Sequence, residues 1–166
     1  FLDPSDRANG LVFDRHGELY ACLGGARQVV RIDAEGKRTI LAKEFGGKKL
    51  NSPNDLVLDD DGGLYFTDPR YGKADDVEQD VMGVYYVSDE GKVARVIGDL
   101  GRPNGIVITP DGSGLYVAVP DKREIHYYPI LAPGRLGKGS MIFRSKREID
   151  GGGPDGMAID EHGHIY

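Results

Sequence analysis

Three features of this 166-residue chain predict an all-β fold built from repeated four-stranded antiparallel units. First, the sequence repeats itself four times at a near-constant interval. Second, the apolar residues of each copy form short strand-like runs separated by glycine-containing turns. Third, no stretch shows the sustained helical period and caps that mark a helix. Four strands in each unit of about 45–50 residues are typical of a β-propeller blade.

The four copies share one order of residue types. They read ANGLVFDRHGELYA, PNDLVLDDDGGLYFT, PNGIVITPDGSGLYVA and PDGMAIDEHGHIY, and they start at residues 8, 53, 103 and 154. Each begins with Ala or Pro, continues with Asn or Asp and then Gly or Asp, and leads into an apolar run and a polar turn. The Asn or Asp falls at positions 9, 54, 104 and 155, so the intervals are 45, 50 and 51 residues. Such a period predicts one structural unit per copy.

Strands are predicted in order within each copy. The first strands are LVFD, DLVLD, GIVIT and GMAID, followed by turns at 15–17, 60–63, 110–114 and 161–163. Gly supplies the positive φ that such hairpin turns require. The second strands are ELYACL, GLYFTD, GLYVAV and HIY. Third and fourth strands are predicted at 28–33 and 38–42, 83–88 and 92–98, and 124–130 and 140–145.

We therefore expect residues 1–166 to form one partial propeller domain of about three and a half blades, with the fourth copy ending in its second strand. A blade buries its faces against its neighbours, so an incomplete circle leaves two faces exposed. This expectation makes the chain a fragment of a longer protein. The alternative is a four-bladed ring completed by residues 1–6, but too little sequence precedes Ala8 for that.

Composition narrows the class of protein. The net charge is −6 with acids and bases interspersed, which argues against a nucleic-acid partner. No apolar run reaches the roughly 18 residues that a membrane span needs. Cys22 is the single cysteine, so it can form no internal disulfide, and cysteine content does not indicate the cellular compartment. We expect it to be a small buried strand residue rather than a nucleophile.

The Asn or Asp at the head of each copy is the first candidate for a functional site. The innermost strands of a propeller line its central channel, so equivalent residues of successive blades form a ring. Asn9, Asn54, Asn104 and Asp155 all offer side-chain oxygens, which suit a hard cation such as Ca²⁺. The alternative is that these residues cap turns, as Asn and Asp before Gly often do. Spacing alone leaves both interpretations open.

The stretches LNSPNDLVLDDDGGLYFTDPRYG, RPNGIVITPDGSGLYVA and PDGMAID resemble the gluconolactonase/regucalcin (senescence marker protein) family, and the likeness covers residues 8–166. Members are six-bladed propellers with one divalent metal, usually Ca²⁺, in the central channel. The resemblance implies a cofactor of this kind, with Zn²⁺, Mn²⁺ or Mg²⁺ as alternative ions. It also implies a hydrolase of a small lactone or ester. Paraoxonase and diisopropylfluorophosphatase share the architecture and a related metal site.

Carried over residue by residue, the resemblance assigns Asn54, Asn104 and Asp155 to the metal. Asn54 also matches a substrate contact in some members, and Asp155 matches the catalytic carboxylate, a general base or, in phosphotriesterase relatives, a nucleophile. Asn9 matches no ligand, and Ser52 stands where some members have a substrate-binding Arg. The family's remaining ligand is a Glu in a Glu-Gly-Pro context, which is not present before Ala8. Residues 1–166 alone are therefore expected to bind metal weakly or not at all and to be inactive.

The segment DPRYGKADDVEQD (68–80) is long for a hairpin connection, and long loops are often functional. If it covers the channel mouth, Arg70 and Tyr71 would contact substrate. Its acids are expected to form a solvated face rather than a second metal site; they are Asp75, Asp76, Glu78 and Asp80. The DDDG motif at 59–62 is interpreted as a β-turn, and the HGH motif at 162–164 as turn residues.

The chemistry that the resemblance implies is hydrolysis of a lactone or ester, with the metal polarising the carbonyl group. Asp155 would accept a proton from the attacking water or orient it. A non-catalytic propeller that serves as a binding scaffold is the alternative from another class, and a phosphotriester hydrolase is the alternative among enzymes. The expected partners are the small-molecule substrate and the remainder of the propeller.

Overall fold

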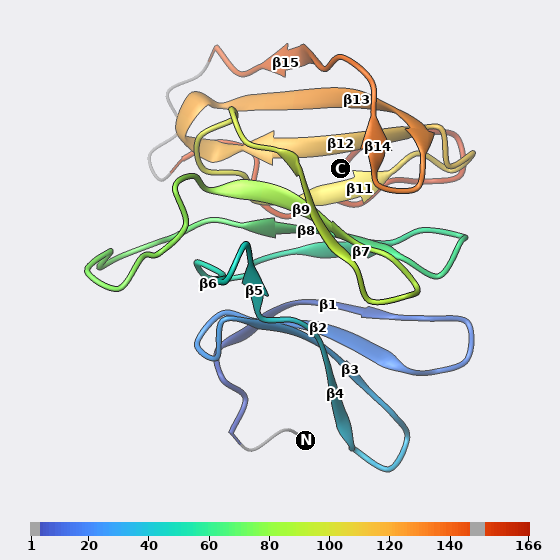
Figure 1. The fold of residues 1–166 in the computed structure, drawn as a ribbon. Coiled ribbons are helices and arrows are strands. Elements are labelled where there is room, and N and C mark those ends of the chain that lie inside the picture. Colours follow the sequence, from blue (N-terminus) through green and yellow to red (C-terminus); the bar gives the residue numbers. More distant parts are fainter. Residues whose placement is uncertain (1–3, 147–151) are drawn as a thin grey trace.

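The computed structural model describes residues 4–146 and 152–166, and the main feature is three antiparallel sheets stacked face to face (Figure 1). Within each sheet, strands that are consecutive in the chain pair with one another, except that β15 (Ser140–Arg144) pairs with β13 (Glu124–Ala132) and not with β14 (Arg135–Leu136). We name the sheets blades 1, 2 and 3 in chain order. Blade 1 consists of β1 (Ala8–Phe13), β2 (Leu19–Leu23), β3 (Gln28–Ile32) and β4 (Arg38–Ala42). Blade 2 consists of β7 (Leu56–Leu58), β8 (Leu64–Asp68), β9 (Gly83–Val87) and β10 (Val93–Ile97). Blade 3 consists of β11 (Ile106–Ile108), β12 (Gly114–Val119), β13 (Glu124–Ala132), β14 (Arg135–Leu136) and β15 (Ser140–Arg144).

These strands confirm the predicted all-β propeller of four-stranded antiparallel blades. The turns between the first and second strands contain glycines with positive φ, as expected; they are Gly17, Gly62, Gly112 and Gly163. In the fourth copy, the described residues include a bridge between Ile159 and Ile165, which lie in the predicted first and second strands. The number of blades in a whole ring stays a prediction.

Three short elements were not predicted from the sequence. The hairpin of β5 (Glu44–Phe45) and β6 (Lys48–Lys49) encloses Gly46 and Gly47, both at positive φ, which is the two-residue turn typical of a tight hairpin. The others are β14 and a 3₁₀ turn, η1 (Pro120–Lys122), that follows β12 directly. In the described residues no helix is long and apolar enough to cross a membrane.

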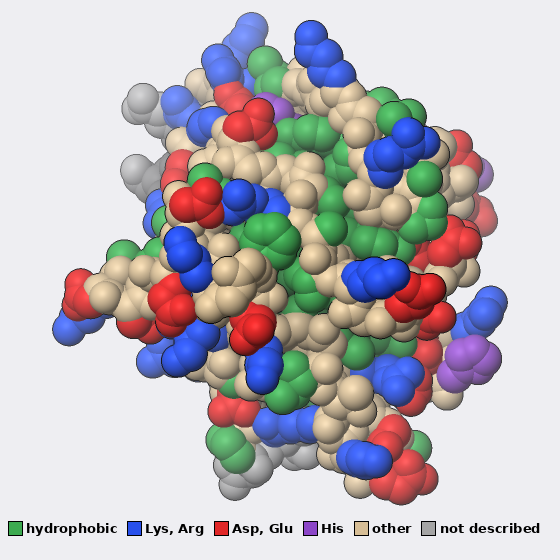
Figure 2. Space-filling model, in the orientation of Figure 1, with side chains coloured by type: hydrophobic (Ala, Val, Ile, Leu, Met, Phe, Trp, Pro, Cys, Tyr) green, Lys and Arg blue, Asp and Glu red, His purple; other side chains and the backbone are tan. Residues whose placement is uncertain are grey.

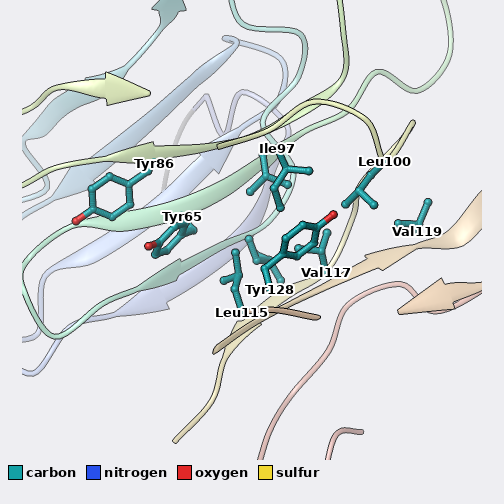
Figure 3. Close-up of a cluster of buried hydrophobic side chains, with 10 residues drawn as sticks. Tyr65, Tyr86, Ile97, Leu100, Leu115, Val117, Val119 and Tyr128 are labelled. Carbon is teal, nitrogen blue, oxygen red and sulfur yellow. The ribbon is translucent and has the colours of Figure 1, made fainter. Parts of the chain in front are cut away.

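Blade 2 is buried on both faces because its strands alternate between two cores. On β8, Phe66 faces a cluster shared with blade 1, whereas Tyr65 faces a cluster shared with blade 3. Neighbouring side chains of a strand point to opposite faces, so an uninterrupted apolar run such as LYF fills both cores. Figure 3 shows the second cluster, in which Tyr65 and Tyr86 of blade 2 meet Leu115 and other residues of blade 3.

The two ends of the stack carry exposed apolar side chains. On β1, Leu11 and Phe13 are 56% and 63% exposed, although Val12 between them packs toward blade 2. On β15, the run Met141, Ile142 and Phe143 is about half exposed. In a stacked-blade architecture such faces are the ones that a neighbouring blade would cover. Inside the stack, β7 contacts both β1 and β11, so the first strands of the three blades are neighbours.

Candidate active site in the channel

The head residues of all four copies meet in one pocket of about 520 Å³. The first three are brought together because β1, β7 and β11 are adjacent. Asn9 is the second residue of β1, and Asn54 and Asn104 lie two residues before β7 and β11. The lining consists of Asn9, Gly10, Asn54, Asp55, Tyr71, Asn104, Asp155 and Gly156. The assignment of Asn54, Asn104 and Asp155 to a metal stays a prediction. The pocket shows that the three residues share one space.

In the first and third copies, glycine follows the head residue because successive copies approach each other too closely for a side chain. The Gly10 N–H donates to the carbonyl of Asn54 at 2.7 Å, and a Cβ on Gly10 would lie 2.6 Å from Cα of Asp55. A Cβ on Gly105 would lie 2.0 Å from the carbonyl oxygen of Asp155. Neither glycine has positive φ, so their role is close packing and not turn formation.

Backbone hydrogen bonds fix the head residues at the ends of their strands. The N–H of Asn54 donates to Thr67 and the N–H of Asn104 donates to Ala118, both at 2.9 Å. Each bond links the head residue to the second strand of its own blade. In addition, the Thr67 hydroxyl donates to the carbonyl of Asn104 at 2.7 Å, which joins blade 2 to blade 3 beside the pocket.

Asp55 is a pocket residue that the sequence analysis missed. Its carboxylate accepts the backbone N–H of Ile106 at 3.1 Å and that of Leu56 at 3.0 Å. Burial raises the pKa of Asp55, and the nearby charge of Asp155 acts in the same direction, while the two backbone N–H groups oppose the rise. The signal was present in the sequence, because the second copy has Asp where the others have Gly.

Tyr71 reaches the pocket from the long loop between β8 and β9, residues 69–82. Its hydroxyl lies 2.7 Å from Nδ2 of Asn104, and burial raises its pKa. Figures 1 and 2 show the loop projecting at the left of blade 2, with both acidic and basic side chains on it. A role for Tyr71 in substrate binding stays a prediction, and its position at the pocket is compatible with that role.

Arg70 does not line the pocket. Its guanidinium donates to the carbonyls of Lys73 at 2.8 Å and Asn51 at 3.2 Å and forms an ion pair with Asp76. Asp76 also pairs with Arg27 of blade 1 at 3.2 Å. Arg70 therefore stabilises the loop. It is not among the residues that line the pocket, so its predicted contact with substrate gains no support there.

The loop acids are exposed, as expected, and three of them support the loop. Asp76 forms the pairs just described, Glu78 accepts the N–H of Lys49 at 2.9 Å, and Asp80 pairs with Arg95 at 2.5 Å. Gln79 is buried and donates to three carbonyls of the β5–β6 hairpin region; they belong to Phe45, Lys48 and Lys49. The loop is thus held to Arg27 of blade 1, to the β5–β6 hairpin and to β10.

Asp68 and Ser52 lie outside the pocket. Asp68 is fully buried and accepts the backbone N–H groups of Asn51 and Ser52, both at 2.7 Å. Burial raises its pKa to about 7, against the effect of these hydrogen bonds and of Arg27 and Arg70. The Ser52 hydroxyl donates to the carbonyl of Gly24 at 3.1 Å. Both residues fix the chain that leads to Asn54.

The other residues singled out in the sequence lie in turns or in the core. Asp59 caps its turn by accepting the N–H groups of Asp61 and Gly63 at 3.0 and 2.7 Å. His164 is exposed in its turn and contacts Asp160 at 2.9 Å. Cys22 is fully buried, and burial raises the pKa of its thiol well above the usual value. The turn interpretations and the buried-cysteine expectation agree with these positions.

The donor chemistry of the pocket fits a hard cation. The side chains that line it offer amide, carboxylate and phenol oxygens, with no imidazole or thiolate. Across residues 4–146 and 152–166, no three His, Cys, Asp or Glu side chains gather where they could hold a metal. A cation here would therefore depend on amide oxygens in addition to the carboxylates of Asp55 and Asp155.

Comparisons with known proteins agree with this fold. The family model of the SMP-30/Gluconolactonase/LRE-like region matches residues 2–166. A gluconolactonase from Zymomonas mobilis is 30% identical over 178 residues, which cover 100% of this chain and 49% of that protein. The solved structure of a Xanthomonas campestris gluconolactonase is 29% identical, with a TM-score of 0.79 over 95% of this chain and 54% of that one.

A more distant solved structure supports the fold alone. Regucalcin from Agrobacterium tumefaciens, described as a calcium-binding protein, is 22% identical with a TM-score of 0.61. The match covers 95% of this chain and 65% of that one. The chain spans about half the length of the curated relatives it matches.

Proposed function

This chain belongs to the SMP-30/Gluconolactonase/LRE-like family, and from that premise we propose that the whole protein hydrolyses a small lactone or ester. The observation that carries the proposal is the convergence of Asn9, Asn54, Asn104 and Asp155 on one pocket of about 520 Å³. A pocket of this size suits a small molecule. Relatives that carry the name gluconolactonase support the lactone as substrate class.

We propose that the pocket holds one divalent cation, and we favour Ca²⁺ because the donors are oxygens. Asn54, Asn104 and Asp155 would hold it, with the Asp55 carboxylate beside them. When bound, such an ion would polarise the substrate carbonyl and stabilise the negative charge that develops on its oxygen. The repulsion between Asp55 and Asp155 that contributes to the raised pKa of Asp55 is consistent with a place for positive charge.

Asp155 is proposed as the residue that acts on water. Its carboxylate would accept a proton as a water oxygen attacks the carbonyl carbon, or would orient that water for attack. The ester C–O bond then breaks, and the alkoxide takes up a proton to give the hydroxy acid. Tight packing of the Asp155 carbonyl against Gly105 fixes the backbone from which this carboxylate extends.

Asn54 and Tyr71 are proposed to contact substrate, since both line the pocket and present polar groups. Arg70 is the weaker candidate because its guanidinium is engaged by Asp76 and by two backbone carbonyls. The exposed apolar faces of β1 and β15 support the proposal that further blades complete the ring. Those blades would supply the remaining metal ligand, so residues 1–166 alone should be inactive.

The experiment uses the full-length protein with a panel of aliphatic and sugar lactones, an aryl ester and a phosphotriester. Asp155→Ala should lower kcat by roughly 10²–10⁴-fold, the range for loss of an acid–base group. Removal of divalent ions with a chelator should abolish turnover, and added Ca²⁺ should restore it. Turnover that survives both perturbations would overturn the mechanism.

The same panel separates the alternatives. Preference for the phosphotriester over every lactone would favour the phosphotriesterase alternative. Absence of turnover on the whole panel, in a folded protein loaded with cation, would favour a binding scaffold.

A further inference from the structure

Asn104 has a fixed backbone but needs a partner to orient its amide. Its N–H and C=O are bonded to Ala118 and Thr67, and only 8% of the residue is exposed. The side-chain amide presents one oxygen acceptor and one NH₂ donor group, and rotation by 180° exchanges them. A cation site requires the oxygen. The orientation of this amide therefore decides whether Asn104 can be a ligand.

The Tyr71 hydroxyl supplies that partner. It lies 2.7 Å from Nδ2 of Asn104 and accepts one of its N–H groups. Because the phenol engages the nitrogen, Oδ1 is the atom left available on the other side of the amide. A reversed amide could still bond to Tyr71 by accepting from the phenol O–H, but it would present its NH₂ group to the pocket. The observed direction, with Nδ2 donating to the phenol oxygen, is the one that leaves Oδ1 for a cation.

Tyr71 itself needs support because it is 42% exposed and comes from the long loop 69–82. Cζ of Arg102 lies 4.8 Å from the centroid of the Tyr71 ring, a distance at which a guanidinium stacks favourably on an aromatic face. Asp121 holds the same guanidinium by two hydrogen bonds, 2.9 Å from Nε and 2.6 Å from Nη2. A bidentate pair of this kind fixes the guanidinium plane as well as its position.

These three residues come from separate parts of the chain. Tyr71 belongs to the loop of blade 2, Arg102 to the connection that precedes β11, and Asp121 to η1 after β12. The contacts run in sequence from Asp121 to Arg102, from Arg102 to Tyr71, and from Tyr71 to Asn104. The loop is also held from its far side through Arg70 and Gln79, so the phenol is restrained from both directions.

We propose that Tyr71, Arg102 and Asp121 form a positioning relay that turns the Asn104 amide so that Oδ1, and not Nδ2, faces the pocket. The proposal deepens the proposed function and rests on it, because the oxygen has a purpose only if the pocket binds a cation. Arg102 and Asp121 act through Tyr71 and do not line the pocket. Partners of this kind, one step removed from a metal ligand, typically change metal affinity when mutated.

The first test measures Ca²⁺ affinity of the full-length protein by calorimetry. Tyr71→Phe keeps the ring for Arg102 but removes the hydroxyl, and it should weaken affinity by roughly 10–100-fold. Arg102→Lys loses the planar stack and the bidentate pair, and it should weaken affinity in the same direction. Thermal unfolding of each variant checks that the fold is retained. Unchanged affinity in both variants would overturn the relay.

Arg38 in β4 offers a control away from the loop. Its guanidinium donates to Asp6 at 2.8 Å and to the carbonyl of Pro4 at 2.6 Å, and it does not line the pocket. Arg38→Lys should leave Ca²⁺ affinity unchanged. An equal loss in Arg38→Lys and Arg102→Lys would show that any such arginine affects the site through general stability, which contradicts the relay.

A second test separates orientation from packing. A carboxylate has two oxygens, so Asn104→Asp cannot present the wrong atom to a cation. In the Asn104→Asp background, Tyr71→Phe should therefore change Ca²⁺ affinity by no more than roughly twofold. The same loss in both backgrounds would mean that Tyr71 acts by filling space, and the relay would be wrong.

A third readout does not depend on the cation. The side-chain amide signal of Asn104 in ¹⁵N NMR should show slow solvent exchange in the wild-type protein and faster exchange in Tyr71→Phe and Arg102→Lys. Equal exchange in all three overturns the relay. If the wild type binds no cation but shows this pattern, the proposed function fails while the orientation of Asn104 stands.

Discussion

Gly105→Ala would test whether the spacing between blade 3 and the fourth copy sets the position of Asp155. The new Cβ would lie 2.0 Å from the carbonyl oxygen of Asp155, 3.0 Å from its carbonyl carbon and 3.1 Å from Cα of Gly156. All three atoms belong to the backbone, so no flexible side chain can move aside. Real Cβ contacts essentially never fall below 3.0 Å, so the Asp155 segment must shift by about 1 Å.

A shift of about 1 Å at a catalytic group can cost on the order of 10²-fold in rate, and overpacking costs ~1–3 kcal/mol of stability. We therefore expect the full-length Gly105→Ala protein to remain folded, with its Tm lowered and its kcat for a lactone reduced about 100-fold. The assay is steady-state lactone hydrolysis, with thermal unfolding measured on the same samples.

Gly98→Ala is the matched control for this substitution. A Cβ on Gly98 would lie 3.6 Å from its nearest neighbour, the Cγ2 atom of Val81, which is an ordinary contact. Gly98 also has no positive φ and does not line the pocket. Its kcat should match the wild type. A wild-type kcat in Gly105→Ala would refute the argument that close packing at this glycine positions Asp155.

Three further predictions concern stability and reactivity. The pKa of Asp68 is raised from 3.8 to about 7, so between these pH values the folded state holds a proton that the unfolded state has released. The free energy of unfolding should therefore fall as the pH rises from 4 to 7, by on the order of 4 kcal/mol at most. Urea titrations at several pH values should show this slope in the wild type and a smaller slope in Asp68→Asn; parallel curves would contradict it. Leu115→Ala, at a fully buried position between blades 2 and 3, should cost ~2–5 kcal/mol in the same titrations, and a loss below ~1 kcal/mol would show that the interface is loosely packed. The Cys22 thiol, fully buried and with its pKa raised by burial, should react with an aromatic disulfide reagent at pH 8 only after unfolding; rapid reaction of the native protein would place it at the surface.

Local sequence patterns were sufficient for the blades because each pattern has a local cause. The alternation that sends Tyr65 and Phe66 into different cores follows from the pleat of a strand. The hairpins follow from glycines that accept positive φ, such as Gly62 and Gly112. The β5–β6 hairpin was missed although Gly46 and Gly47 mark it, because it lies outside the four-strand repeat used to assign strands.

Local patterns also predicted one part of the candidate site and not the other. The repeat period placed Asn9, Asn54, Asn104 and Asp155 at equivalent positions, and equivalent positions of neighbouring blades share one pocket. Arg70 and Tyr71 are adjacent in the sequence, yet Tyr71 lines the pocket, whereas the Arg70 guanidinium forms an ion pair with Asp76 of the same loop. No local rule distinguishes the two, since the path of a 14-residue connection depends on contacts with Arg27 and Phe45, which are far away in the chain.

The sequence by itself determined the repeated unit, its strands and the ring of head residues, because a period in the chain becomes a period in space once equivalent blades stack. Only the tertiary structure decided which other groups reach that ring. It placed Asp55 against the N–H of Ile106 and the Tyr71 phenol against Asn104. Both contacts join residues more than 30 positions apart, and they exist because packing between blades and the path of one loop bring those atoms together.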